Sequence, residues 1–286
     1  MQKNWISLGL MSGTSGDGVD ASIINTDGIN QYDSVKDKYF EYDLNLYRDI
    51  HNLKDKIHKI EHLKIYEDQI DNLERKITNF HAKIIKELNI SEDTIVGFHG
   101  QTIFHNPEKK ISKQLGNGRL LSQLINRKVI FNFRSNDILH GGQGAPLTPV
   151  FHHLISVQNQ IVLPVCFLNI GGISNITIVH DKTNLSNLVS KDIGPGNCLI
   201  DSWVRNNSNK KFDKDGKLAL SGSKNEIIFE QAQELYMNRS HKKKLSFDTN
   251  DFDISFVRGL SLEDGATTLT DFTASIIAVS YTHLRA

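Results

Sequence analysis

Residues 9–20 read Gly-Leu-Met-Ser-Gly-Thr-Ser-Gly-Asp-Gly-Val-Asp, and this stretch decides the fold of the first part of the chain. An apolar run from Trp5 to Met11 leads into it, and an alternating run from Val19 to Ile24 leads out of it. The pattern predicts a β-hairpin whose turn carries three glycines and three hydroxyl side chains. Glycine lets a backbone approach a ligand closely, and successive N–H groups form a concave nest for anions. We therefore expect a phosphate site at this turn.

Two carboxylates, Asp17 and Asp20, flank the turn. Such groups beside a phosphate site suit a nucleotide that carries magnesium, because this ion prefers oxygen ligands and keeps several waters. The turn is neither a Walker loop nor a dinucleotide fingerprint, since no helix follows it and the Gly-Lys-Ser/Thr ending is absent. The alternative interpretation is a tight hairpin whose polar residues bind no ligand.

Composition limits the classes of function. The chain has 286 residues, enough for two domains with a core each, and its 33 basic residues balance 33 acidic ones. Without a basic stripe, nucleic acid and anionic membranes are not expected partners. No apolar run is long enough for a membrane span, and no secretory signal pattern opens the chain. Cys166 and Cys198 form no metal or redox motif, which fits a reducing cytoplasm.

The order of predicted elements repeats along the chain. In the first part we expect strands over 6–11, 19–24 and 35–42, a long helix over 60–88 capped by Asn89, a strand over 94–98, a helix over 119–126 and a strand over 129–133. In the second part we expect strands over 165–170, 174–179 and 187–193, a helix over 198–205, a surface loop over 206–224, a helix over 226–237, a solvated loop near Lys242–Lys244 and a helix over 266–278. Two such units indicate α/β domains that face each other across a ligand-binding cleft.

Five segments in this order resemble the anhydro-N-acetylmuramic acid kinase family. They are Gly13-Thr-Ser-Gly-Asp-Gly-Val-Asp20, Gly97-Phe-His-Gly-Gln-Thr102, Asn132-Phe-Arg-Ser-Asn-Asp137 running into Gly141-Gly-Gln-Gly-Ala-Pro-Leu147, Asn169-Ile-Gly-Gly-Ile-Ser-Asn-Ile-Thr177, and Asp192-Ile-Gly-Pro-Gly-Asn197. The resemblance implies an actin-like, ribonuclease H-like duplicated fold of two ATPase lobes around a central cleft. It also implies a cytoplasmic bacterial enzyme of peptidoglycan recycling and amino sugar catabolism. This enzyme uses ATP and water to convert 1,6-anhydro-N-acetylmuramic acid into N-acetylmuramic acid 6-phosphate.

The resemblance assigns roles to residues. Asp192 ends a strand before a glycine turn and a helix start, and it is the expected catalytic base. The expected ATP-binding residues are Gly13, Thr14, Ser15, Gly16, Asp17, Gly18, Val19, Asp20, Gly194 and Gly196. The expected sugar-binding residues are His99, Gln101, Arg134 and Asn175. Asp17 and Asp20 are expected to hold Mg²⁺ through ATP, and the resemblance is compatible with a homodimer.

Structural alternatives stand beside these roles. Asp192 could cap the helix that starts near Asn197, although Asn197 itself is better placed for capping. His99 and Gln101 could be buried groups that satisfy a loop, and Arg134 could pair with Asp137. At the level of function, the alternatives are an actin-like phosphohydrolase, a chaperone-like switch or a sugar-binding relative without catalysis.

Some positions depart from the family pattern. Gly16 stands where a bulky apolar residue is usual, Asn132 where Asp is usual, and Ile193 where Thr is usual. By analogy with the first lobe, at least one strand and one helix are expected to be missing after 266–278. The glycine-rich turn that packs against the adenosine in the family is also expected to be missing, since no Gly-Gly pair follows Gly172. We therefore expect a first lobe over 1–134, a truncated second lobe with an open sheet edge over 135–278, and a non-native tail over 279–286.

Overall fold

The computed structural model describes residues 4–238 and 246–285, which divide into two compact units. Within these residues, the first unit takes the chain up to Val165 together with Val179–Leu188. The second unit takes Cys166–Ile178 and the chain from Val189 onward. Residues 135–165, which we assigned to the second lobe from the sequence, thus cluster with the first unit. None of the helices in the described segments is both long and apolar enough to cross a bilayer.

The first unit is built on a six-stranded mixed sheet of order β3-β2-β1-β4-β5, in which β6 also pairs with β4. The predicted hairpin is confirmed, since β1 and β2 are antiparallel with Met11 opposite Asp20. β4 runs parallel to β1 and β6. The bounds are β1 (Trp5–Ser12), β2 (Gly18–Thr26), β3 (Tyr32–Glu41), β4 (Ile95–Asn106), β5 (Ile111–Leu115) and β6 (Val129–Phe131).

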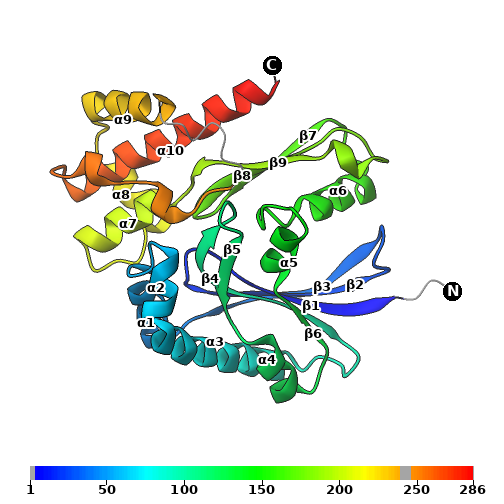
Figure 1. Ribbon diagram of the computed structural model, residues 1–286. Coiled ribbons are helices and arrows are strands. Elements are labelled where there is room, and N and C mark those ends of the chain that lie inside the picture. The colour runs from blue at the N-terminus through cyan, green and yellow to red at the C-terminus, as the bar shows by residue number, and fades with distance from the viewer. Residues whose placement is uncertain (1–3, 239–245, 286) are drawn as a thin grey trace. The chain divides into compact units, whose positions relative to one another are not determined.

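Helices cover this sheet, with α1, α3 and α4 along one face and α5 and α6 on the other side (Figure 1). Their bounds are α1 (Leu44–Lys54), α2 (Ile60–Ile65), α3 (Glu67–Leu88), α4 (Gly118–Ile125), α5 (Phe133–Leu139) and α6 (Pro149–Gln158). The single helix expected over 60–88 is interrupted at Tyr66, whose φ of −105° and ψ of 23° are not helical. It ends as predicted at Asn89, which takes the left-handed conformation with φ of 48°.

The sequence interpretation missed α1, β5, α5 and α6. α1 begins at Asp43, whose carboxylate accepts from the N–H groups of Asn45 and Leu46. β4 continues well past the predicted end at Phe98. Its register with β1 shifts between Phe98 and Gln101, where Gly100 has φ of 73°, and the strand then goes on beside β5. The glycine motif that we placed after a strand therefore lies within one.

The second unit contains a three-stranded sheet of order β7-β8-β9, and a cluster of helices with its own apolar core. The bounds are β7 (Val165–Ile170), β8 (Ile173–Val179), β9 (Val189–Pro195), α7 (Cys198–Asn207), α8 (Lys217–Ser221), α9 (Glu226–Asn238) and α10 (Leu262–Arg285). Short 3₁₀ turns are η1 (Leu185–Asn187), η2 (Lys214–Gly216), η4 (Thr249–Asp251) and η5 (Ser255–Val257).

The predicted strands and helices of this unit are confirmed, with two corrections. The segment over 206–224, which we expected to be a loop, contains α8. This helix has five residues and buries Leu218, and the polar residues around it give no helical pattern in the sequence. α10 starts four residues before the predicted helix and includes residues 279–285. The prediction followed the apolar stripe, whereas the backbone N–H and C=O groups continue their helical pairing beyond it. The solvated loop expected near Lys242–Lys244 lies outside the described residues.

Candidate functional site

The hairpin turn of the first unit presents backbone donors. The N–H of Gly16 donates to the carbonyl of Gly13 at 3.2 Å, and Gly16 has φ of 64°, a conformation that favours glycine. Within the described residues, the N–H groups of Thr14, Ser15 and Asp17 have no protein acceptor. These groups can therefore donate to an anion, which is the property expected of a phosphate site.

Neighbouring elements hold the turn in place. The amide Nε2 of Gln101, on β4, donates to the carbonyl of Gly13 at 2.8 Å. The ammonium of Lys54, at the end of α1, donates to the carbonyl of Thr14 at 2.6 Å. The N–H of Tyr42 donates to the carbonyl of Asp17 at 2.9 Å. The turn is thus fixed from β4, from α1 and from the segment between β3 and α1, and Lys54 and Tyr42 are contacts that the sequence motifs did not reveal.

Gln101 is fully buried, and its carbonyl Oε1 has no hydrogen-bond partner among the described residues. The bond from Nε2 to Gly13 fixes which end of the amide is which, since the opposite orientation would bring two acceptors together. Oε1 lies beside Gly16, where a Cβ atom would be 3.9 Å from it. We predicted that Gln101 contacts the sugar, but its observed contact is with the turn.

The carboxylates near the turn give it negative charge. Desolvation, and then the charge of Asp17, raise the pKa of Asp20. Desolvation and the charges of Asp17, Glu41 and Asp20 raise the pKa of Tyr39 to about 12. No group of three or more His, Cys, Asp or Glu side chains gathers as a metal-ligand set in the described segments. A cation at Asp17 and Asp20 would therefore need further ligands from phosphate or water.

His99 and Arg134, both predicted to bind the sugar, contact each other. Arg134 Nε donates to His99 Nε2 at 2.9 Å, while His99 Nδ1 donates to the carbonyl of Gly100 at 2.6 Å. Burial, and then the nearby Arg134 charge, lower the pKa of His99 to about 3, so the ring is neutral. Arg134 Nη1 donates to the carbonyl of Gly144 at 2.8 Å, and Asp137 accepts from the N–H of Gly144 at 2.7 Å. Arg134 and Asp137 therefore hold the same peptide backbone.

In the second unit, Asp192 lies on β9 directly opposite Asn175 on β8. Its side chain is buried, and Oδ2 accepts from the N–H of Phe247 at 2.8 Å and from the hydroxyl of Ser246 at 3.3 Å. Asn197 occupies the N-cap position of α7, as expected, but its side chain donates to the carbonyl of Ile170 at 3.3 Å and accepts no helix N–H. The carboxylate of Asp192 is held by the chain before η4 instead of by α7.

The glycine turns around Asp192 pack closely against protein. The N–H of Gly196 donates to the carbonyl of Gly172 at 3.0 Å, and a Cβ at Gly196 would lie 2.2 Å from the carbonyl oxygen of Gly171. A Cβ at Gly194 would lie 2.5 Å from Ile276 Cγ2. These contacts explain why both positions are glycine without reference to a ligand.

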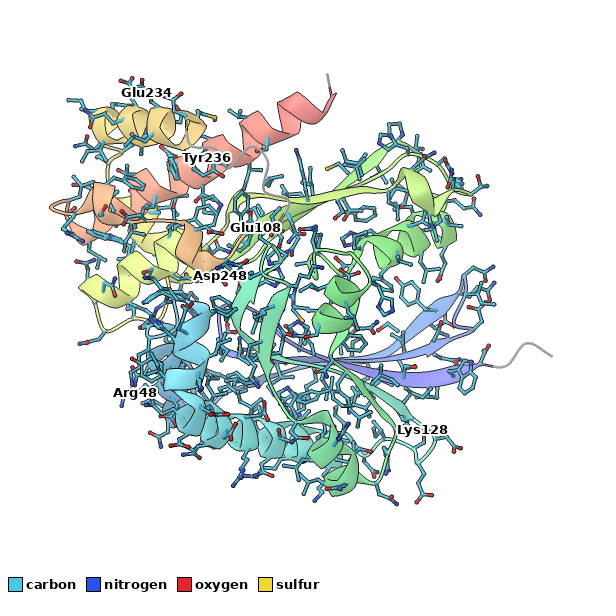
Figure 2. All side chains as sticks on the ribbon, viewed as in Figure 1. Arg48, Glu108, Lys128, Glu234, Tyr236 and Asp248 are labelled. Atoms are coloured by element: carbon cyan, nitrogen blue, oxygen red, sulfur yellow. The ribbon has the colours of Figure 1, made fainter. Side chains whose placement is uncertain are left out.

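Tyr236 on α9, whose side chain is labelled in Figure 2, contacts the strand that carries Asp192. Its ring centroid lies 5.8 Å from that of Phe272 on α10, and burial raises the pKa of its hydroxyl to about 12. The hydroxyl donates to the carbonyl of Ile193, the residue after Asp192, at 3.5 Å. Aromatic packing thus supports the strand that carries Asp192.

The predicted site residues therefore form three observed groups. The turn residues and Gln101 form one group, and His99 with Arg134 forms a second, both in the first unit. Asp192, Asn175, Gly194 and Gly196 form the third, in the second unit. Val19 is buried in the core of β2, so its contribution to the turn is structural.

Comparison with known proteins gives a consistent result. The model of the family described as anhydro-N-acetylmuramic acid kinase matches residues 5–285. Curated relatives of that name come from Pelagibacter ubique, 58% identical over 97% of this chain and 74% of the relative, and Agrobacterium fabrum, 34% identical over 97% of this chain and 76% of the relative. A third, from Gluconobacter oxydans, is 36% identical over 95% of this chain and 76% of the relative.

Proposed function

Since this chain belongs to the anhydro-N-acetylmuramic acid kinase family, we propose that it converts 1,6-anhydro-N-acetylmuramic acid, ATP and water into N-acetylmuramic acid 6-phosphate and ADP. The match over residues 5–285 is the observation that carries this proposal. The chain is thus a phosphotransferase with a small sugar as acceptor and ATP as donor. The reaction would serve peptidoglycan recycling in the cytoplasm, with a homodimer as the working form.

Asp192 is the proposed general base. Water attacks the anomeric carbon, the bond from that carbon to O6 breaks, and O6 takes the γ-phosphoryl group. A carboxylate that accepts the proton of the attacking water makes that water a better nucleophile. The bond from the Phe247 N–H to Oδ2 fixes the direction of the carboxylate, which supports this role.

The hairpin turn is the proposed phosphate site. The N–H groups of Thr14, Ser15 and Asp17 would donate to phosphate oxygens, as helix and nest N–H groups do elsewhere. Asp17 and Asp20 would hold a hydrated Mg²⁺ carried by ATP, and the metal would withdraw negative charge from the phosphoryl group during transfer. Gly194 and Gly196 remain proposed as further backbone contacts to ATP.

The sugar would contact Asn175, His99 and Arg134. The guanidinium of Arg134 suits the lactyl carboxylate of the sugar, because a planar fork can pair with both oxygens. His99 would position that guanidinium through its bond to Nε. For Gln101 the contact with Gly13 favours support of the turn over binding of the sugar.

The fold proposed for the two units is the actin-like duplicated one. The order β3-β2-β1-β4-β5 in the first unit, with an antiparallel hairpin beside parallel strands, supports this assignment. The shorter sheet β7-β8-β9 followed by helices is its proposed counterpart in the second unit.

One assay tests the function. ADP release by the purified chain is followed with and without the anhydro sugar, and the product is identified by mass. We expect ADP release to depend strictly on the sugar and to equal the amount of 6-phosphate formed. ADP release without sugar would indicate a phosphohydrolase, and sugar binding with no ADP release would indicate a binding protein.

A further inference from the structure

Helix α1 ends at the hairpin turn. A Cβ at Gly16 would lie 3.1 Å from Ile50 Cγ2 and 3.5 Å from His51 Nε2, so the last turns of this helix contact the hairpin. The carboxyl end of a helix carries a partial negative charge, which disfavours an anion nearby. Two basic side chains, His51 and Lys54, lie in this last turn.

Acidic side chains add to the same effect. Asp17 belongs to the turn, Asp20 follows it on β2, and Glu41 on β3 acts on Tyr39 together with them. A polyphosphate that bound the backbone N–H groups here would therefore meet carboxylates and a helix carboxyl end. The backbone N–H donors would have to overcome this repulsion between the polyphosphate and the carboxylates. Binding therefore requires positive charge from a side chain or a bound cation.

We propose that Lys54 supplies this charge and is an ATP-binding residue that contacts the polyphosphate at the turn. The inference rests on the proposed phosphate-binding role of the turn. Lys54 Nζ lies 2.6 Å from the carbonyl oxygen of Thr14, and it is half-buried at the edge of the turn. An ammonium has three donors in a compact charge, so its bond to Thr14 holds that charge at the turn, where it also attracts phosphate oxygens.

Lys56 provides a matched control. It follows Lys54 by two residues, but its ammonium donates to Gln69 at 3.1 Å and lies 5.6 Å from the ring centroid of Tyr66, away from the turn. Lys54→Met and Lys56→Met remove the same charge and keep a similar chain length. Lys54→Arg keeps the charge and the ability to donate to Thr14.

The test is the ATP dissociation constant of the whole chain, measured by calorimetry with magnesium and with EDTA, at low and at high salt. We expect Lys54→Met to weaken binding about ten- to hundredfold, as loss of a hydrogen bond to a charged group does. The loss should be larger in EDTA, where phosphate carries its full charge, and smaller at high salt because salt screens the attraction. Lys56→Met should bind as the unaltered chain does, and Lys54→Arg should retain most of the affinity.

The outcomes separate this inference from the proposed function. Equal affinity in Lys54→Met and the unaltered chain overturns the role of Lys54 alone. A loss that is the same at all salt concentrations and is accompanied by a lower melting temperature also overturns it, because it would indicate only a structural tie between α1 and the turn. Failure of the unaltered chain to bind ATP would count against the phosphate site itself, and the role of Lys54 would fall with it.

Discussion

Gln101 lies in an environment that costs free energy. It is fully buried, its Nε2 holds Gly13, and its Oε1 has no partner among the described residues. A buried carbonyl without a donor costs about 1–3 kcal/mol. Proteins keep such groups where function requires them, and this one lies against the proposed phosphate turn.

Gln101→Met should therefore separate stability from function. Methionine has a similar length and no polar atom, so the lost bond to Gly13 is offset by removal of the unpartnered oxygen. We expect the free energy of unfolding in urea to change by less than about 1 kcal/mol, while the ATP dissociation constant rises about tenfold. Sugar binding should not change. Weaker sugar binding with normal ATP binding would show that Gln101 contacts the sugar after all.

At Asp192, the substitution Asp192→Asn keeps the size of the side chain and removes only its ability to act as a base. In Asp192→Asn, the side-chain carbonyl can still accept from the N–H of Phe247, so the fold should persist. The base is lost, and turnover should fall about a hundred- to ten-thousandfold. The exposed Asp253, which also accepts from a backbone N–H, provides the control Asp253→Asn, with turnover unchanged. Near-normal turnover in a folded Asp192→Asn protein would exclude a role as base.

At the scale of elements, α3 is anchored to the sheet by a buried histidine. The ring of His81 is fully buried, lies 4.8 Å from the ring of Phe98, and donates from Nδ1 to the carbonyl of Ile77 at 2.8 Å. Its Nε2 lies 3.5 Å from the hydroxyl of Ser12, the last residue before the turn. Burial lowers the pKa of His81 to about 4, so α3 docks with a neutral ring.

This anchoring predicts acid sensitivity. The folded-state pKa of His81 lies below its unfolded value near 6.5, so the unfolded chain takes up a proton first as the pH falls. The stabilisation should be complete above about pH 6.5 and should be lost between about pH 6.5 and pH 4, with His99 acting in the same direction. The check is urea unfolding at several pH values. His81→Leu should flatten this slope, and an unchanged slope would refute the role of His81.

Elements differ in how far the sequence predicts them. The hairpin and α3 follow from alternation and from an apolar stripe, both of which are local patterns. α5, with seven residues, is too short to show such a stripe, and the bulge at Gly100 depends on a backbone conformation that the strand pattern does not show. The site contacts are harder still, because Gln101 meets Gly13 across 88 positions of sequence and Lys54 meets Thr14 across 40. The spacing of residues along the sequence does not predict such long-range contacts.

At the scale of the whole molecule, the chain has two apolar cores. One contains Leu8, Val96 and Ile77 in the first unit, and the other contains Val204 and Leu269 in the second. Of the two tryptophans, Trp5 lies exposed on β1 of the first unit, and Trp203 lies buried on α7 within the second core. Trp203 fluorescence therefore reports on the second core, and ATP affinity reports on the turn of the first.

Leu269→Ala tests whether the two cores contribute separately. Leu269 is fully buried on α10 among the helices of the second unit, so its truncation leaves a cavity and should destabilise that unit by about 2–5 kcal/mol. We expect the Trp203 transition in urea to move to lower concentration, with ATP affinity at native conditions unchanged. Ile77→Ala, in the first core, should leave the Trp203 midpoint in place and weaken ATP binding through α3. If both variants shift the Trp203 midpoint equally, the two cores unfold as one cooperative body and the separation fails.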